Sequence, residues 1–72
     1  MGKRNELLST KFAANLRRTR ERRGLTYTAA AANLGVHRQS WVKWETGERV
    51  PHINAIHEIA TSLGCSVASL LR

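Results

Sequence analysis

Residues 38–45 form a short segment whose side chains fall into two groups when placed on a helix. Trp41 and Trp44 share one face, because residues three apart are neighbours on a helix. The other side carries Arg38, Gln39, Val42 and Lys43. Arginine can donate two hydrogen bonds to guanine, glutamine can pair in the same bidentate way with adenine, and an apolar side chain can contact the methyl group of thymine. The alternative interpretation is an ordinary solvated helix face.

The length and the charge of the chain limit its function classes. Its 72 residues are enough for one small domain. The formal net charge of +7 is uneven, because residues 1–23 hold eight basic and two acidic residues, whereas residues 50–72 hold one of each. This asymmetry predicts a positive face that suits a polyanion, with nucleic acid as the leading partner and an anionic membrane surface as the competitor. A solvated basic helix with no partner is the third interpretation.

The sequence offers little for catalysis or metal binding. Cys65 is the single cysteine, which rules out an internal disulfide framework and a paired-cysteine zinc site. His52 and His57 miss the i, i+4 spacing for chelation from one helix face. We therefore expect no catalytic residue, no metal and no cofactor, and we expect Cys65 to be a small buried side chain. With no apolar run near the ~20 residues of a membrane span and no secretory signal, we expect a cytoplasmic, nucleoid-associated protein and no membrane partner.

Glycine positions and apolar periodicity predict short helices and no sheet. The expected helices run from about 10 to 23, 27 to 34, 38 to 45 and 53 to 63, and a short last helix follows Ser66 as its cap. Thr26 is the expected N-cap of the second helix, and Gly35 is expected to turn the chain sharply after it. Residues 1–9 are expected to form a flexible basic arm, and residues 10–72 one all-α domain.

Two short helices joined by Leu34-Gly35-Val36 have the layout of a helix-turn-helix, whose second helix enters the major groove of DNA. Over about residues 10–71 the sequence resembles the lambda-repressor/Cro-like helix-turn-helix family. The stretches that carry the resemblance, in order, are residues 16–26, 31–36 and 44–47, Pro51, and residues 59–64. The resemblance implies a compact fold of five helices around one core. It also implies sequence-specific binding of double-stranded DNA, as a homodimer on a palindromic operator.

The resemblance implies roles for individual residues. Arg38, Gln39 and Lys43 match the base-reading positions of the recognition helix, and Val42 beside them would touch a thymine methyl group. Contacts to the DNA backbone are expected from Thr26, Tyr27, His37, Thr46, Arg49 and His52. His37 is expected either to cap the recognition helix or to reach a phosphate. Tyr27 stands where the family commonly has glutamine, and Glu48 in the loop would repel phosphate.

Other positions are expected to be structural. By family position Arg20 and Glu45 face each other as a charge-assisted, partly buried ion pair between the first and third helices. Trp41 and Trp44 are expected in the core instead of forming a base-stacking platform. The family has an aliphatic residue where this chain has Trp41 and leucine where it has Ala30, so the two exchanges together would conserve core volume.

Three functions stay open on the sequence. The first is a small phage- or plasmid-type repressor without a small-molecule effector, dimerising through the C-terminal region. The candidates for that contact are Ile53, Val67, Leu70 and Leu71, several of which must also serve the core. The second is an antitoxin or a coactivator-type protein-interaction module on the same fold. The third is a basic amphipathic domain on anionic membranes, which the position of the tryptophan pair away from the basic face of the first helix disfavours.

Overall fold

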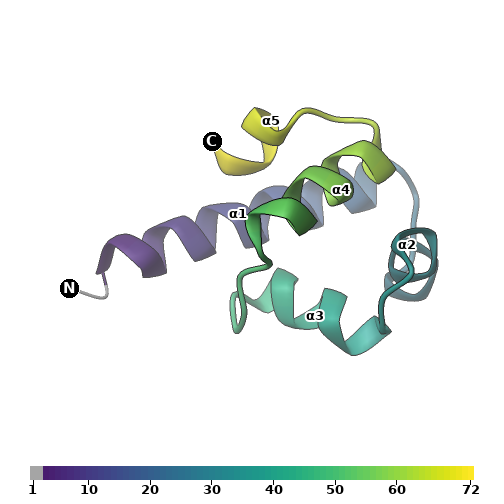
Figure 1. Cartoon of the computed structure of the whole chain (residues 1–72), viewed down its shortest axis with the longest axis horizontal. Coiled ribbons are helices and arrows are strands. Elements are labelled where there is room, and N and C mark those ends of the chain that lie inside the picture. Colours follow the sequence, from purple (N-terminus) through teal and green to yellow (C-terminus); the bar gives the residue numbers. More distant parts are fainter. Residues whose placement is uncertain (1–2) are drawn as a thin grey trace.

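The structure is a computed structural model that describes the backbone from Lys3 to Arg72 and the side chains from Thr10 onward. This part of the chain consists of five helices without any strand, so the predicted all-α fold of five helices is confirmed. The helices are α1 (Lys3–Arg22), α2 (Tyr27–Leu34), α3 (Arg38–Thr46), α4 (Ile53–Leu63) and α5 (Val67–Leu71). In Figure 1, α3 lies along the lower edge and α5 along the upper edge, with α1 and α4 between them.

The expected start of the first helix at Thr10 is wrong, because α1 begins at Lys3. No glycine or proline interrupts residues 3–22, and the segment is rich in leucine, lysine, arginine and alanine, which have high helix propensity. Residues 3–9 therefore continue the helix instead of forming an irregular arm. Residues 1 and 2 of that expected arm lie outside the described part of the chain.

The turn between α2 and α3 is built as expected. Thr26 is the N-cap of α2, and its hydroxyl oxygen accepts a hydrogen bond from the backbone N–H of Ala29. Gly35 follows α2 with φ of 78°, in the left-handed region that glycine adopts at no steric cost. Its N–H donates to the carbonyls of the preceding turn, and the chain reverses there to start α3 at Arg38. The expected bounds of α2 and α4 are confirmed, and α3 extends one residue further, to Thr46.

A single cluster of buried apolar side chains holds the helices together. Trp41, Phe12, Leu16, Ile59 and Leu70 are its largest fully buried members. Burial of such a side chain contributes about 1.5–3 kcal/mol to stability. The core positions predicted for Trp41 and Trp44 are confirmed, and Ala30 belongs to the same cluster, as the expected exchange of large and small side chains requires. Cys65 is half-buried against this cluster and is not fully enclosed.

Two polar side chains of the α1 segment tie the C-terminal part of the chain to it. The amide nitrogen of Asn15 donates to the carbonyls of Leu70 at 3.0 Å and Arg72 at 3.3 Å. Arg23, directly after α1, donates to the carbonyl of Gly64 at 3.0 Å. Both contacts satisfy carbonyls at or after a helix C-terminus, which have no partner within the helix itself. Within the described residues, no helix is long and apolar enough to cross a bilayer.

Candidate nucleic-acid interface

The N-terminal end of α3 presents polar side chains to solvent. Arg38 and Gln39 are exposed, and Val42 and Lys43 are half-buried. The opposite face of α3 is occupied by Trp41 and Trp44, which are buried in the core. The side chains predicted to read bases therefore lie on the outer face of α3.

His37 occupies the N-cap position of α3 with an extended backbone, and its side chain makes no capping hydrogen bond. Of the two roles expected for this exposed residue, capping through the imidazole is therefore wrong. Contact with a phosphate stays a prediction.

A buried ion pair fixes α3 against α1. Arg20 Nε donates to Glu45 Oε2 at 2.6 Å, and Nη2 donates to Oε1 at 3.2 Å. The side chains are only 10% and 2% exposed, respectively, so water screens the pair weakly. The hydrogen bond to Glu45 raises the pKa of Arg20 above its ordinary value, although burial acts in the opposite direction. The ion pair expected between these two residues is present, and Arg20 also donates to the carbonyl of Leu25 at 2.7 Å.

Glu45 has a further partner that the sequence did not predict. Trp41 Nε1 donates to Glu45 Oε2 at 2.6 Å, one turn earlier on the same helix. The carboxylate thus accepts hydrogen bonds from both α1 and α3, and no buried side-chain polar atom is left without a partner in the described part of the chain. Charge-assisted hydrogen bonds are directional and strong. The bonds from Arg20 to Glu45 therefore set the position of α3 on α1, and the bond from Trp41 holds the carboxylate in place. The i, i+4 spacing of tryptophan and glutamate was the available sequence signal.

Tyr27 lies between the structural ion pair and the outer end of α3. The Cζ atom of Arg20 is 4.4 Å from the centre of the tyrosine ring, and that of Arg38 is 5.5 Å away. Both distances are within the range of cation–π attraction, which contributes about 0.5–1 kcal/mol at an exposed site. The ring therefore restrains the guanidinium group of Arg38 beside the N-terminus of α2. Contact of the Tyr27 hydroxyl with phosphate stays a prediction, and the contact of its ring with Arg38 is an additional finding of the structure.

The remaining side chains expected to contact the DNA backbone are exposed, and several also stabilise helix ends. Thr26 caps α2, and His52 accepts a weak capping hydrogen bond at α4 from Asn54 at 3.5 Å. The hydroxyl of Thr46 donates to the carbonyl of Lys43. Arg49 is exposed, and its backbone N–H donates to the same carbonyl, which shapes the loop after α3. The N-termini of α2 and α4 beside these caps carry partial positive charge and unpaired N–H groups, which attract phosphate.

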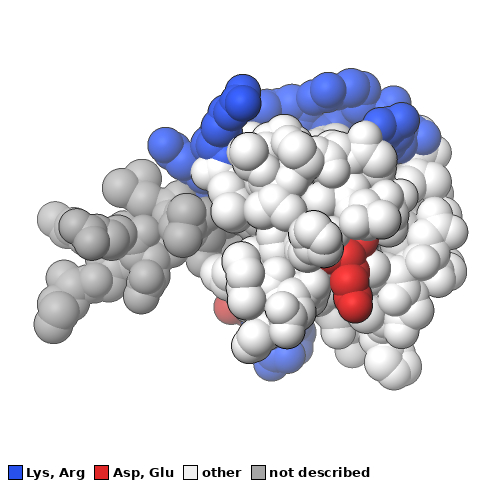
Figure 2. Space-filling model, turned by 45° about the horizontal axis from the view of Figure 1, so that its top comes forward, with Lys and Arg blue, Asp and Glu red and all other residues white. Residues whose placement is uncertain are grey.

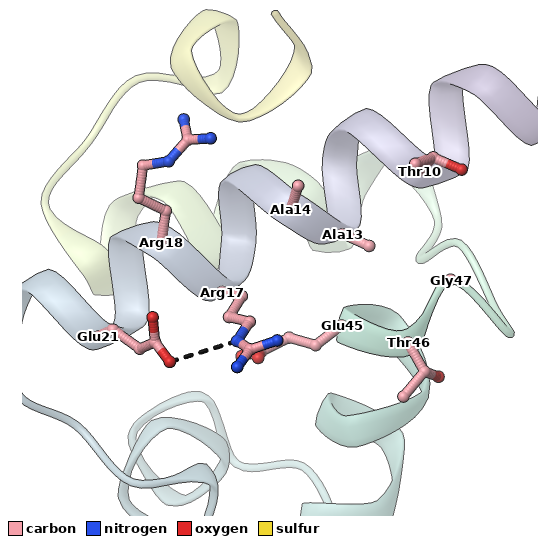
Figure 3. Close-up of a pocket in the computed structure, with 9 residues that line it drawn as sticks. All are labelled: Thr10, Ala13, Ala14, Arg17, Arg18, Glu21, Glu45, Thr46 and Gly47. Atoms are coloured by element: carbon pink, nitrogen blue, oxygen red, sulfur yellow. Dashed lines mark hydrogen bonds and ion pairs between the residues drawn. The ribbon is translucent and has the colours of Figure 1, made fainter.

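A hollow of about 460 Å³ separates α1 from the C-terminal end of α3. Figure 3 shows that Arg17 points from α1 toward Glu45 and α3, whereas Arg18 points toward α5. Arg17 forms an exposed ion pair with Glu21 at 3.2 Å. On the side of α1 that faces α3, the described arginines Arg17 and Arg20 are thus both paired with acidic side chains.

The short helices α2 and α3 are joined at a left-handed glycine. A buried ion pair holds α3 against α1, and the N-terminal end of α3 exposes polar side chains. This arrangement defines a helix-turn-helix domain of the lambda-repressor/Cro type. The chain belongs to the helix-turn-helix domain family, whose model matches residues 11–72. No curated protein matches the chain.

Solved structures contain the same fold within longer proteins. An HTH_3 family transcriptional regulator from Vibrio cholerae is 29% identical, with a TM-score of 0.86 over 92% of this chain and 37% of that one. A hypothetical transcription factor, NHTF, from Neisseria is 25% identical, with a TM-score of 0.86 over 90% of this chain and 75% of that one. The hydroxypropylphosphonic acid epoxidase from S. wedmorenis is 32% identical, with a TM-score of 0.85 over 90% of this chain and 35% of that one. The chain therefore spans little more than a third of the regulator from Vibrio cholerae and of the epoxidase.

Proposed function

We propose that this chain is a sequence-specific, double-stranded DNA-binding transcriptional regulator that acts as a small repressor of the phage or plasmid type. In this proposal α3 enters the major groove, Arg38 and Gln39 bind base edges, and Val42 and Lys43 complete the base contacts. Thr26, Tyr27, His37, Thr46, Arg49 and His52 contact the sugar-phosphate backbone.

One observation carries this proposal: Arg38 and Gln39 stand exposed at the end of a helix whose other face is buried in the core. Because the tryptophan face and the Arg20–Glu45 pair fix α3, a base contact would not have to organise the helix first. The ring of Tyr27 adds to this by restraining Arg38. Membership in the helix-turn-helix family and the likeness to transcription regulators from two organisms support the same function.

The dimer contact of the proposal needs a correction at Leu70. Leu70 is fully buried in the core of its own chain, so it is not available to a partner, and Val67 and Leu71 are half-buried against the same core. Ile53, in contrast, is 60% exposed, and Val50 nearby in the chain is 45% exposed. We place the homodimer contact at Val50 and Ile53, where two copies would cover these apolar side chains. The variant Ile53→Glu should then sediment as a monomer at concentrations where the wild type sediments as a dimer.

The rest of the proposal concerns the setting of the domain. We assign it no catalytic role, no cofactor and no small-molecule effector, and we place it in the cytoplasm on the nucleoid. Because the fold also occurs inside an epoxidase, these assignments concern this chain and not every protein that contains the domain. The alternative function, an antitoxin or coactivator-type interaction module, becomes the better account if no duplex sequence is preferred.

Selection of bound sequences from random duplex DNA at moderate salt tests the proposal. We expect enrichment of a two-fold symmetric site whose half-sites are about one helical turn, ~34–36 Å, apart. Equal recovery of all sequences would reduce the DNA contact to a nonspecific electrostatic one and would contradict the proposal.

A further inference from the structure

Much of the positive charge of α1 lies on the side that faces away from α3. Lys11, Arg18 and Arg22 follow the spacing i, i+7, i+11 and therefore share one side of the helix. Arg23 follows them directly after α1, and Arg18, Arg22 and Arg23 border a common hollow of about 340 Å³. We call these four residues the basic ridge. In Figure 2 the blue atoms of lysine and arginine form a continuous band along the upper edge of the molecule.

The direction of the ridge follows from the contacts of its neighbours. Asn15 lies on the same side of α1 and donates to the carbonyl of Leu70 in α5. Arg20, on another side of α1, binds Glu45 of α3. Because α3 and α5 lie at opposite edges of the molecule (Figure 1), the ridge does not share a surface with the exposed end of α3. A duplex lying against Arg38 and Gln39 would leave the ridge open.

The charges of the ridge are not compensated within the described part of the chain. All four side chains are exposed, and none of them forms an ion pair with a described acidic residue. Arg18 donates only to the side-chain oxygen of Asn15, and Arg23 to the carbonyl of Gly64. Arg18 and Arg22 are four residues apart on α1, and like charges at this spacing repel one another. The ridge therefore destabilises the isolated fold and favours a bound polyanion.

The shape and composition of the ridge indicate the kind of polyanion. Lys11 and Arg22 are eleven residues apart on a helix that rises 1.5 Å per residue, so the cations extend along a line of roughly 16 Å. A line of cations fits a linear polyanion better than a single small anion. Protein interfaces have an apolar centre, but the large exposed apolar residues of the described chain, Val50 and Ile53, lie outside the ridge. Single strands are bound by stacking on aromatic rings, and the ridge has none.

We propose that the basic ridge binds the phosphate backbone of a second DNA duplex, so that the domain bridges two duplex segments. This proposal rests on the proposed function, since the first duplex is the one that α3 recognises. Arginine is suited to the contact because its planar guanidinium group binds phosphate oxygens in a bidentate manner. The contact carries no base recognition and depends strongly on salt.

A bridging assay with the whole chain tests the proposal. A duplex carrying the selected site is fixed to beads and saturated with protein, and a labelled duplex of unrelated sequence is then added. We expect wild-type protein to retain the labelled duplex at about 0.05 M salt. The variant Arg22→Gln should retain it about tenfold more weakly and Arg18→Gln/Arg22→Gln about a hundredfold more weakly, because each lost phosphate contact removes about 0.9 from the salt slope. The control Arg17→Gln removes one charge from the side of α1 that faces α3 and should retain the labelled duplex like the wild type.

Several results would overturn the proposal. The first is that wild-type protein captures no labelled duplex, and the second is that Arg18→Gln/Arg22→Gln captures as much of it as the wild type does. The third is that this variant loses binding to the bead-held duplex as strongly as it loses capture of the labelled one, which would mean that the ridge touches the first duplex. If the wild type captures a polyglutamate peptide through the ridge and no duplex, the ridge is an acidic-protein site. If selection yields no preferred site, the proposed function fails by itself. The ridge is then judged on random duplex in solution, where Arg18→Gln/Arg22→Gln must weaken binding about a hundredfold and Arg17→Gln must not.

Discussion

Removing Arg20 should destabilise the fold far more than removing its near neighbour Arg17. The side chain of Glu45 is 2% exposed, and its carboxylate accepts hydrogen bonds from Arg20 and Trp41. Arg20→Ala removes the first donor and leaves the carboxylate with Trp41 alone. Breaking a buried pair by removing one partner costs about 3–5 kcal/mol. The total stability expected of a domain of this size is about 4–11 kcal/mol. We therefore expect the melting temperature of Arg20→Ala to fall by about 12–40 °C.

Arg17→Ala is the matched control, because it removes the same type of side chain three residues away. Its ion pair with Glu21 is exposed at both ends, and such i, i+4 pairs contribute about 0.3–0.5 kcal/mol. The melting temperature of this variant should stay within about 4 °C of the wild type.

The assay is urea unfolding followed by circular dichroism, with thermal melts for comparison. The double variant Arg20→Met/Glu45→Gln removes both charges and keeps an acceptor for Trp41, so it should recover more than half of the stability that Arg20→Ala loses. Equal destabilisation by Arg20→Ala and Arg17→Ala would refute the reasoning. A double variant no better than Arg20→Ala would show that the stranded charge is not the cause.

Other predictions concern the interface and the turn. Arg49→Ala should weaken binding to all duplex sequences alike and reduce the salt slope by about 1, and a loss confined to one sequence would contradict its assignment to the backbone. Tyr27→Phe should keep the base preference of Arg38 in a competition assay, because the aromatic ring stays in place. Tyr27→Leu should relax that preference, and equal preference in both variants would rule out a role of the Tyr27 ring in positioning Arg38. Gly35→Ala should lower the free energy of unfolding by roughly 1–2 kcal/mol in urea, because φ is 78° there, and unchanged stability would contradict the left-handed turn.

Much of the fold could be predicted from the sequence, because its local signals agree with the tertiary packing. Thr26, Gly35 and Gly64 mark helix ends that the structure places at the same residues. Leu70 shows where pattern alone was insufficient. An apolar residue near the C-terminus fits a core or an interface equally well, and only the packing of α5 against α1 decides for the core. The predicted start of the first helix at Thr10 is wrong because residues 3–9, although basic, have enough helix propensity to continue α1.

The sequence predicted the exposed end of α3 and the ion pair behind it, whereas the contacts between these residues were harder to predict. The exposure of Arg38 and the Arg20–Glu45 pair agree with what family positions implied. The contact of Tyr27 with both arginines depends on the angle between α1, α2 and α3, which no local pattern encodes. The separation of the α1 charges between two sides of the molecule likewise required the placement of α3 and α5.

Methylation interference at guanine N7 tests the central claim most directly, because a methyl group there blocks the major-groove acceptor that arginine binds. With the selected duplex, we expect methylation of one guanine per half-site to abolish binding by the wild type. Arg38→Ala should bind with about 1–3 kcal/mol less free energy and should no longer respond to methylation of that guanine. Wild-type binding that is insensitive to every N7 methyl group, or an Arg38→Ala variant blocked by the same guanine, would contradict insertion of the N-terminal end of α3 into the major groove.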